Sequence, residues 1–124
     1  MRRRFLMGVG ALVLALAAPA LADGDVTRGR KVYERCQGCH SIDRNRAGPR
    51  HRGLFGRRAG TVPGFEYSRA MRRSGIVWTA ATLDRFLAAP LKAVPGTIMG
   101  FDGVKDARER ADLIAYLKRA TAGR

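Results

Sequence analysis

The chain has 124 residues, the length of one small domain whose core would be thin by itself. Its 24 Lys and Arg residues against 10 Asp and Glu residues give a formal net charge of +14. Such a charge fits an acidic protein partner, nucleic acid or plain solubility. No basic motif interleaved with aromatic residues occurs, so nucleic acid is not expected as a partner.

The first 22 residues have the composition of a signal peptide. Arg2–Arg4 form a positive beginning, Phe5–Ala18 form an apolar stretch, and Ala20–Ala22 fit a small-residue cleavage site. We therefore predict a cleavable signal peptide over 1–22, export to the periplasm, and one domain over 23–124. An uncleaved anchor is the alternative, although the apolar stretch is shorter than the ~20 residues of a membrane-spanning helix. Cleavage would lower the net charge from +14 to +11, because it removes three arginines and no acidic residue.

A first helix is expected from about Asp25 to Gly38, with Asp25 as a suitable N-cap. Gly29 lies inside it at a cost of about 1 kcal/mol relative to alanine, which suggests that another backbone passes close by. Residues 41–67 are rich in Gly, Pro and Arg and show no sustained period. They are therefore expected to form loops.

The end of this first helix carries the motif Cys36-Gln37-Gly38-Cys39-His40, which is typical of c-type haem attachment. Residues three or four apart share one face of a helical turn, so Cys36, Cys39 and His40 can all face one flat macrocycle. The two thiols would add to the haem vinyl groups as thioethers, and the His40 ring would bind the iron. One haem c per chain is therefore expected.

The same cysteines and histidine could instead belong to two different kinds of site. A redox-active disulfide is typical of a βαβ context, which the sequence does not show. A structural zinc site needs about four ligands, which the two cysteines could reach only with both His40 and His51. A five-residue pattern can also occur by chance.

Two further short helices are predicted after the loops. Ser68 can cap a helix that ends at Arg73, and Thr79 can cap one that runs to about Ala88. Pro90 then ends the second of these, because a proline disfavours helical backbone at the residue before it.

The chain beyond the signal segment has two methionines, Met71 and Met99. Met71 lies in a short amphipathic stretch and is expected to pack. Met99 follows a Pro95-Gly96 turn on a loop that can approach the haem, and a thioether ligand favours reduced iron. With His40 and Met99 both bound, the iron keeps no open position. This pattern favours an electron carrier over chemistry on a bound ligand.

The last helix is expected to begin after Asp106, which has capping-box spacing to Glu109. Its apolar face is formed by residues at helical spacing, namely Ala107, Ala111, Leu113, Ile114, Tyr116 and Leu117. No strand pattern of comparable strength occurs. The expected fold class is all-α.

Several segments in order along residues 24–121 resemble class I cytochrome c of the short bacterial and mitochondrial type. The matching segments are Gly48-Pro49, Gly53–Arg57, Pro63–Phe65 with Tyr67, Trp78, Pro95–Thr97 with Met99, and Asp112–Leu117. The resemblance implies the class I cytochrome c fold, with short helices and loops wrapped around one covalently bound haem.

The resemblance also implies roles near the iron. Met99 would be the distal ligand, and the Pro49 carbonyl would accept a hydrogen bond from the second ring nitrogen of His40. Thr97 would help to hold the haem and its distal loop. Phe101 would screen the haem edge on the methionine side.

Three further residues would serve a haem propionate. Tyr67 and Trp78 would hydrogen-bond it, and Arg57 would offset its buried charge. Ordinary core packing is the alternative for the two aromatic residues. Gly29 and Tyr33 would lie where the first and last helices cross.

The sequence departs from the family at several positions near the haem. His51 stands where the family usually has leucine, and we expect it beside the proximal haem wall and not as a ligand. The alternative is that His51 replaces Met99 under some conditions, so that two histidines bind the iron. Phe86 lies where many family members have tyrosine, and Leu91 and Ile98 lie where many have lysine. Lys92 lies where the family's side chain can displace the methionine at high pH.

The expected function is that of a soluble, monomeric, periplasmic electron carrier between membrane-bound or soluble redox proteins. Acidic docking surfaces on those partners would attract the basic chain, with Arg35 and Lys92 as plausible contacts. Brief contact with a membrane surface is compatible with the charge. The alternatives are a small haem peroxidase that works when Met99 dissociates, and a membrane-tethered redox subunit if the signal segment is retained.

Overall fold

The computed structural model describes residues 10–14 and 23–123 of the chain. Within these residues the secondary structure is helical, and the one β feature is an isolated bridge between Arg58 and Val77. The helices are α1 (Val26–Tyr33), α2 (Arg69–Arg72), α3 (Ala80–Ala88), α4 (Pro90–Ala93) and α5 (Ala107–Ala120). The expected all-α class is confirmed.

The predicted helix starts are confirmed by their N-caps. In each case a side-chain oxygen accepts a hydrogen bond from the backbone N–H three residues further on, which satisfies a donor that the helix itself leaves unpaired. The capping residues of α1, α2, α3 and α5 are Asp25, Ser68, Thr79 and Asp106. At α3 the Thr82 side chain also bonds back to the Thr79 backbone, so the capping box is complete.

Two predictions, on the end of α1 and on the buried face of α5, need correction, and the predicted end of α3 is confirmed but needs one addition. The α-helix α1 ends at Tyr33 and not near Gly38, because the chain tightens there into successive turns with bonds three residues apart. Pro90 ends α3 and also begins α4, where its fixed φ and missing N–H suit the first helical position. Ala107 is exposed, so it does not belong to the buried face of α5.

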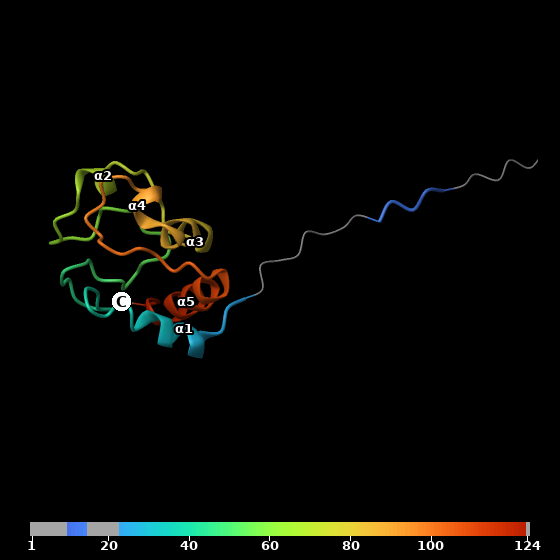
Figure 1. The fold of residues 1–124 in the computed structure, drawn as a ribbon, viewed down its shortest axis with the longest axis horizontal. Coiled ribbons are helices and arrows are strands. Elements are labelled where there is room, and N and C mark those ends of the chain that lie inside the picture. The colour runs from blue at the N-terminus through green and yellow to red at the C-terminus, as the bar shows by residue number, and fades with distance from the viewer. Residues whose placement is uncertain (1–9, 15–22, 124) are drawn as a thin grey trace, which may run out of the picture.

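Helices α1 and α5 lie side by side and hold the two ends of the domain together (Figure 1). A Cβ on Gly29 would lie 1.8 Å from the Asp112 carbonyl oxygen and 2.8 Å from the Tyr116 Cβ, so the expected close backbone approach is confirmed. Leu113, buried on α5, belongs to the same core cluster as the residues of α1 that face it.

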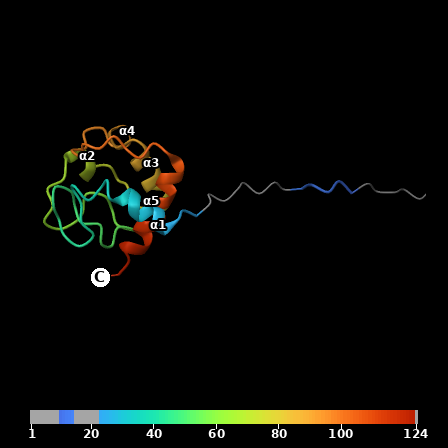
Figure 2. The same ribbon diagram turned by 60° about the horizontal axis from the view of Figure 1, so that its bottom comes forward.

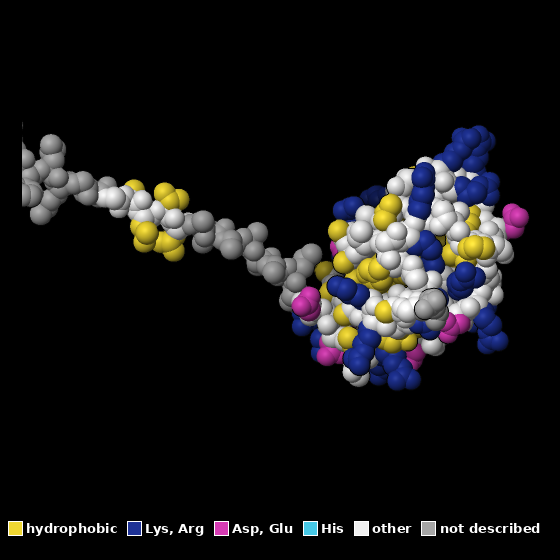
Figure 3. Space-filling view, turned by 180° about the vertical axis from the view of Figure 1, so that it is seen from behind, with side chains coloured by type: hydrophobic (Ala, Val, Ile, Leu, Met, Phe, Trp, Pro, Cys, Tyr) yellow, Lys and Arg dark blue, Asp and Glu magenta, His cyan; other side chains and the backbone are white. Residues whose placement is uncertain are grey.

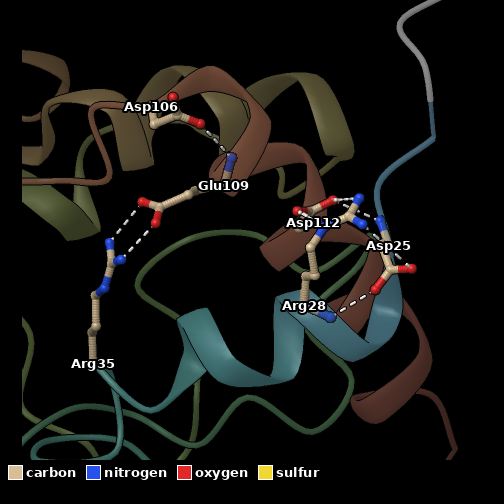
Figure 4. A network of polar contacts seen from close by, with 6 residues as sticks. All are labelled: Asp25, Arg28, Arg35, Asp106, Glu109 and Asp112. Carbon is tan, nitrogen blue, oxygen red and sulfur yellow. Dashed lines mark hydrogen bonds and ion pairs between the residues drawn. The ribbon is translucent and has the colours of Figure 1, made fainter.

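Ion pairs support this crossing (Figure 4). The Asp112 carboxylate is 4% exposed and accepts hydrogen bonds from the Arg28 side chain and from the Asp25 backbone N–H. Arg35, just beyond α1, makes two parallel hydrogen bonds of 2.8 and 2.7 Å to the Glu109 carboxylate on α5. Together these contacts fix the position of the turn that carries the cysteine motif.

The predicted loops over 41–67 are confirmed, and they form the side of the domain opposite α1, α3 and α5 (Figure 2). Of the predicted signal peptide, only residues 10–14 are described, where Leu12, Val13 and Leu14 are exposed and not helical. The rest of that segment lies outside the described residues. Among the residues described, no helix has the length and apolar character to cross a membrane.

Candidate haem site

A cavity of about 300 Å³ lies between the loops and the helices. This volume falls in the range of small-molecule and cofactor sites. The cavity is lined by all the residues expected at the site, namely Cys36, Cys39, His40, Pro49, Arg57, Tyr67, Trp78, Thr97, Met99 and Phe101. The structure therefore brings together side chains that are spread over more than half of the sequence.

The cysteine motif lies on the turns that follow α1. The Cys36 N–H donates to the Tyr33 carbonyl at 2.8 Å, and the N–H groups of Cys39 and His40 both donate to the Cys36 carbonyl, at 3.1 and 2.8 Å. These bonds set the two thiols and the imidazole on one curved backbone at the cavity wall. The two cysteines are not joined by a disulfide.

The Cys36 thiol and its surroundings differ from those of the competing sites. Burial raises the pKa of the Cys36 thiol to about 11, whereas redox-active cysteine pairs depend on a lowered thiol pKa. Among the residues that the structure describes, no three His, Cys, Asp or Glu side chains lie close enough together to hold a metal ion. A zinc site of protein ligands is therefore not supported.

The His40 imidazole is oriented by backbone groups. Its Nδ1 donates to the Pro49 carbonyl oxygen at 2.8 Å, as the family resemblance implies, and a carbonyl can only accept. Nδ1 therefore carries the proton, and Nε2 keeps its lone pair. Burial lowers the pKa of His40, which keeps the ring neutral. These features are those of an imidazole prepared to bind a metal through Nε2.

Gly48 explains how the ring fits so close to the chain. A Cβ at Gly48 would lie 2.3 Å from the His40 Cε1 atom, so no side chain can replace the hydrogen there without moving the imidazole. This constraint was not assigned from the sequence. The one local indication was a glycine directly before Pro49.

Arg57 places a positive charge in the cavity wall. Its guanidinium donates to the backbone carbonyls of Arg52 and Arg50, at 2.9 and 3.0 Å, and it has no carboxylate partner among the described residues. Burial lowers the pKa of Arg57, because taking the charged guanidinium out of water carries a cost. An anionic group in the cavity would remove that cost, and a haem propionate has this chemistry.

Two aromatic side chains add hydrogen-bond donors to the same cavity. The Tyr67 hydroxyl accepts a bond of 3.1 Å from the Val62 N–H, so its own proton remains free to donate. The Trp78 ring is buried, and its N–H donates to no residue that the structure describes. Buried Tyr and Trp usually find a partner for their polar end, so both fit a propionate in the cavity.

The methionine loop closes another wall. The Thr97 hydroxyl accepts a hydrogen bond from the Met99 N–H at 3.2 Å, and the Phe101 N–H donates to the Met99 carbonyl at 2.9 Å. These bonds hold the loop on both sides of the thioether. The remaining wall is apolar, since Phe86 is buried against the Trp78 ring.

His51 lies against the His40 imidazole. Its ring is stacked on that of His40, with 4.2 Å between ring centroids and 21° between ring planes. This agrees with the expected place beside the proximal wall, and an exchange with Met99 would require the ring to leave this stack. Burial lowers the pKa of His51 to about 3, so the ring is neutral at physiological pH.

Met71 packs in the core, as its sequence context predicts, but it also lines the cavity. The sequence does not separate these two places, because a short amphipathic helix gives the same pattern for both. Met71 is therefore a natural comparison for Met99 in tests of iron ligation.

Comparisons with known proteins agree with this geometry. The model of the family described as Cytochrome c matches residues 26–121. Cytochrome c from Sesamum indicum is 47% identical over 103 residues, covering 80% of this chain and 93% of the relative. Cytochrome c2 from Blastochloris viridis is 43% identical over 116 residues, covering 91% of each.

A solved structure agrees with the same fold. Cytochrome cH from Methylobacterium extorquens superposes with a TM-score of 0.76 at 41% identity, covering 77% of this chain and 99% of that one. The match of sequence, fold and cavity lining leads to one conclusion. The chain belongs to the class I cytochrome c family, whose cofactor is a haem c bound covalently through two cysteines.

Proposed function

We propose that this protein is a soluble, periplasmic carrier of single electrons, whose haem is attached at Cys36 and Cys39 and whose iron is bound by His40 and Met99. The observation that supports this most directly is the bond from His40 Nδ1 to the Pro49 carbonyl, beside a cavity that Met99 also lines. It fixes the tautomer that an axial imidazole needs.

The haem, when bound, supplies one-electron chemistry at its iron. The chain has three tasks toward the haem, namely to bind its iron, to exclude water and to balance the charge of a propionate. His40 and Met99 would both bind the iron, which would leave no position for another ligand, and the thioether would favour the reduced state. Apolar side chains such as Leu83 and Phe86 exclude water from the cavity, while Arg57 offers a partner for the negative charge of a propionate. The relatives named cytochrome c, cytochrome c2 and cytochrome cH support the same role.

The surface suits brief docking to acidic redox partners. Lys and Arg side chains are spread over the face seen in Figure 3, with fewer acidic side chains between them. Ile98 lines the cavity and is 68% exposed, so it lies at the cavity mouth, and Leu91 is also exposed. We propose that these apolar side chains form the centre of a small, transient interface with a basic surround.

Of the two expected docking contacts, Arg35 is a weaker candidate than Lys92. The Arg35 guanidinium is already paired on the surface with Glu109 through two hydrogen bonds, so its charge is partly balanced within the chain. Lys92 makes no ion pair among the described residues and is exposed on α4, which leaves it as the better candidate. The association rate with an acidic redox protein should fall steeply with salt, and a flat salt dependence would refute electrostatic steering.

Ligation by Met99 is tested with a matched pair of variants. The oxidised wild type should show the weak long-wavelength absorption band of sulfur-to-iron ligation. Met99→Ala should abolish this band, and Met71→Leu should keep it, because both methionines line the cavity but only Met99 is held on the distal loop. Loss of the band in Met71→Leu, or its survival in Met99→Ala, would overturn the assignment.

Export is tested by mass. A mature chain that begins near residue 23 and carries the added mass of one haem, recovered from the periplasmic fraction, is the expected result. A chain that keeps residues 1–22 and stays with the membrane fraction would favour the membrane-tethered redox subunit.

A further inference from the structure

Three rings form a connected group on the proximal side of the site. The Tyr33 hydroxyl and the His51 Nδ1 atom are 2.9 Å apart, which makes a hydrogen bond, and the two rings meet edge to face at 61° with 5.7 Å between centroids. His51 is in turn stacked on His40. The axial imidazole is thus connected through two side chains to helix α1, which carries Tyr33 at its end.

Backbone groups restrain the His40 ring at two places. The Pro49 carbonyl accepts a hydrogen bond from Nδ1, and the Gly48 backbone opposes turning of the ring plane on its side, since a Cβ there would lie only 2.3 Å from Cε1. A flat partner stacked on the ring opposes this turning, because the two rings would lose contact as their planes separate. His51, with 21° between the planes, is in the position to do this.

His51 can act in this way only if it is itself fixed. Tyr33 supplies a firm anchor, because it is 2% exposed and its ring also packs against Tyr116 of α5, with 5.3 Å between centroids. The anchor therefore belongs to the buried crossing of α1 and α5. An apolar residue at position 51 could fill the same space but could not accept or donate this hydrogen bond.

We propose that His51 is a positioning residue for the axial ligand, held by the Tyr33 hydroxyl and setting the orientation of the His40 imidazole plane relative to the haem. The proposal rests on the proposed function, since it takes His40 as the proximal ligand. The plane of an axial imidazole determines which iron d orbital mixes with the porphyrin. His51 and Tyr33 would thereby influence how unpaired electron spin is distributed over the haem of the oxidised protein. This distribution includes the haem edge through which electrons leave.

The test uses the intact holoprotein in its oxidised state. Proton NMR spectra record the four haem methyl resonances, whose order and spread report the orientation of the axial ligand plane. The variants are His51→Leu, which removes the stacked ring, and Tyr33→Phe, which removes only one hydroxyl. Tyr116→Phe is the matched control, because it removes a hydroxyl from the same aromatic group without touching His51.

We expect His51→Leu to shift the haem methyl resonances, Tyr33→Phe to shift them less in the same direction, and Tyr116→Phe to leave them in place. The double variant of Tyr33 and His51 should match His51→Leu, because the hydroxyl acts only through the His51 ring. Unchanged resonances in His51→Leu would show that the His51 ring only fills space, and they would overturn the proposal. A shift in His51→Leu without one in Tyr33→Phe would overturn the role of the hydroxyl.

The absorption spectrum of each variant separates the positioning role of His51 from the proposed His40 and Met99 ligation. If the sulfur-to-iron band persists while the methyl resonances do not move, the positioning role fails and His/Met ligation stands. If the wild type itself lacks the band, the proposed function fails first. Tyr33→Phe conserves the packing volume, so the test does not depend on whether His51→Leu folds.

Discussion

Replacing Gly29 by alanine tests the packing of α1 on α5, on which the placement of the cysteine motif depends. Helix propensity alone predicts a gain of about 1 kcal/mol from this change. The tertiary structure predicts the opposite, since the added methyl carbon would lie 1.8 Å from the Asp112 carbonyl oxygen and 2.5 Å from its carbonyl carbon. Helix propensity and tertiary packing therefore predict effects of opposite sign on the free energy of unfolding.

The size of the effect follows from what must move. Ordinary contact lies near 3.5 Å, so the helices would have to separate by roughly 1.5 Å at this point. The obstacle is backbone, which cannot rotate away as a flexible side chain can. Overpacking of this kind costs about 1 to 3 kcal/mol, and we place this case at the upper end. After the gain in propensity, unfolding free energy should fall by about 2 kcal/mol, or roughly 8 to 16 °C in Tm.

The assay is urea unfolding of the oxidised holoprotein, followed by far-ultraviolet circular dichroism. Gly38→Ala is the control, because a Cβ there meets no atom within 4 Å. We expect a lower midpoint with unchanged slope for Gly29→Ala and no loss for Gly38→Ala. A Gly29→Ala protein as stable as the wild type would refute the close approach of the two helices.

The hydrogen bond from Arg28 lowers the pKa of Asp112, so the stabilisation is present at neutral pH and is lost as the pH falls through that lowered pKa. Asp112→Asn should therefore lower the urea midpoint at pH 7 but hardly at strongly acidic pH, and an equal loss at both would contradict the ion pair. Arg57→Gln removes a positive charge from the cavity wall, which should ease oxidation and lower the midpoint potential in a redox titration. An unchanged potential would count against Arg57 beside the haem. Lys92→Ala should retain the sulfur-to-iron band to higher pH, whereas loss of the band at the same pH would exclude Lys92 as the alkaline ligand.

Much of the fold follows from local chemistry. Asp25 and Thr79 cap their helices because a short polar side chain reaches the free N–H three residues on, and both partners are visible in the sequence. The end of α1 at Tyr33 and the start of α4 at Pro90 were missed. Both depend on backbone turns that the apolar spacing does not encode.

The residues of the site also differ in whether a local sequence pattern predicts their role. The spacing of Cys36, Cys39 and His40 indicates the cofactor, because the chemistry requires those groups on one turn. The stacking of His51 on His40 and the burial of Asp112 arise from segments that meet only after folding. No local sequence pattern distinguishes a histidine that stacks on a metal-binding histidine from one that faces solvent.

We propose that the haem iron has both axial positions filled, by His40 and Met99. Carbon monoxide tests it directly, because this gas binds reduced haem iron only where a position is open. Added to the reduced wild-type protein at neutral pH, it should leave the absorption spectrum unchanged. Rapid conversion to a carbon monoxide complex would show an open iron and contradict the account.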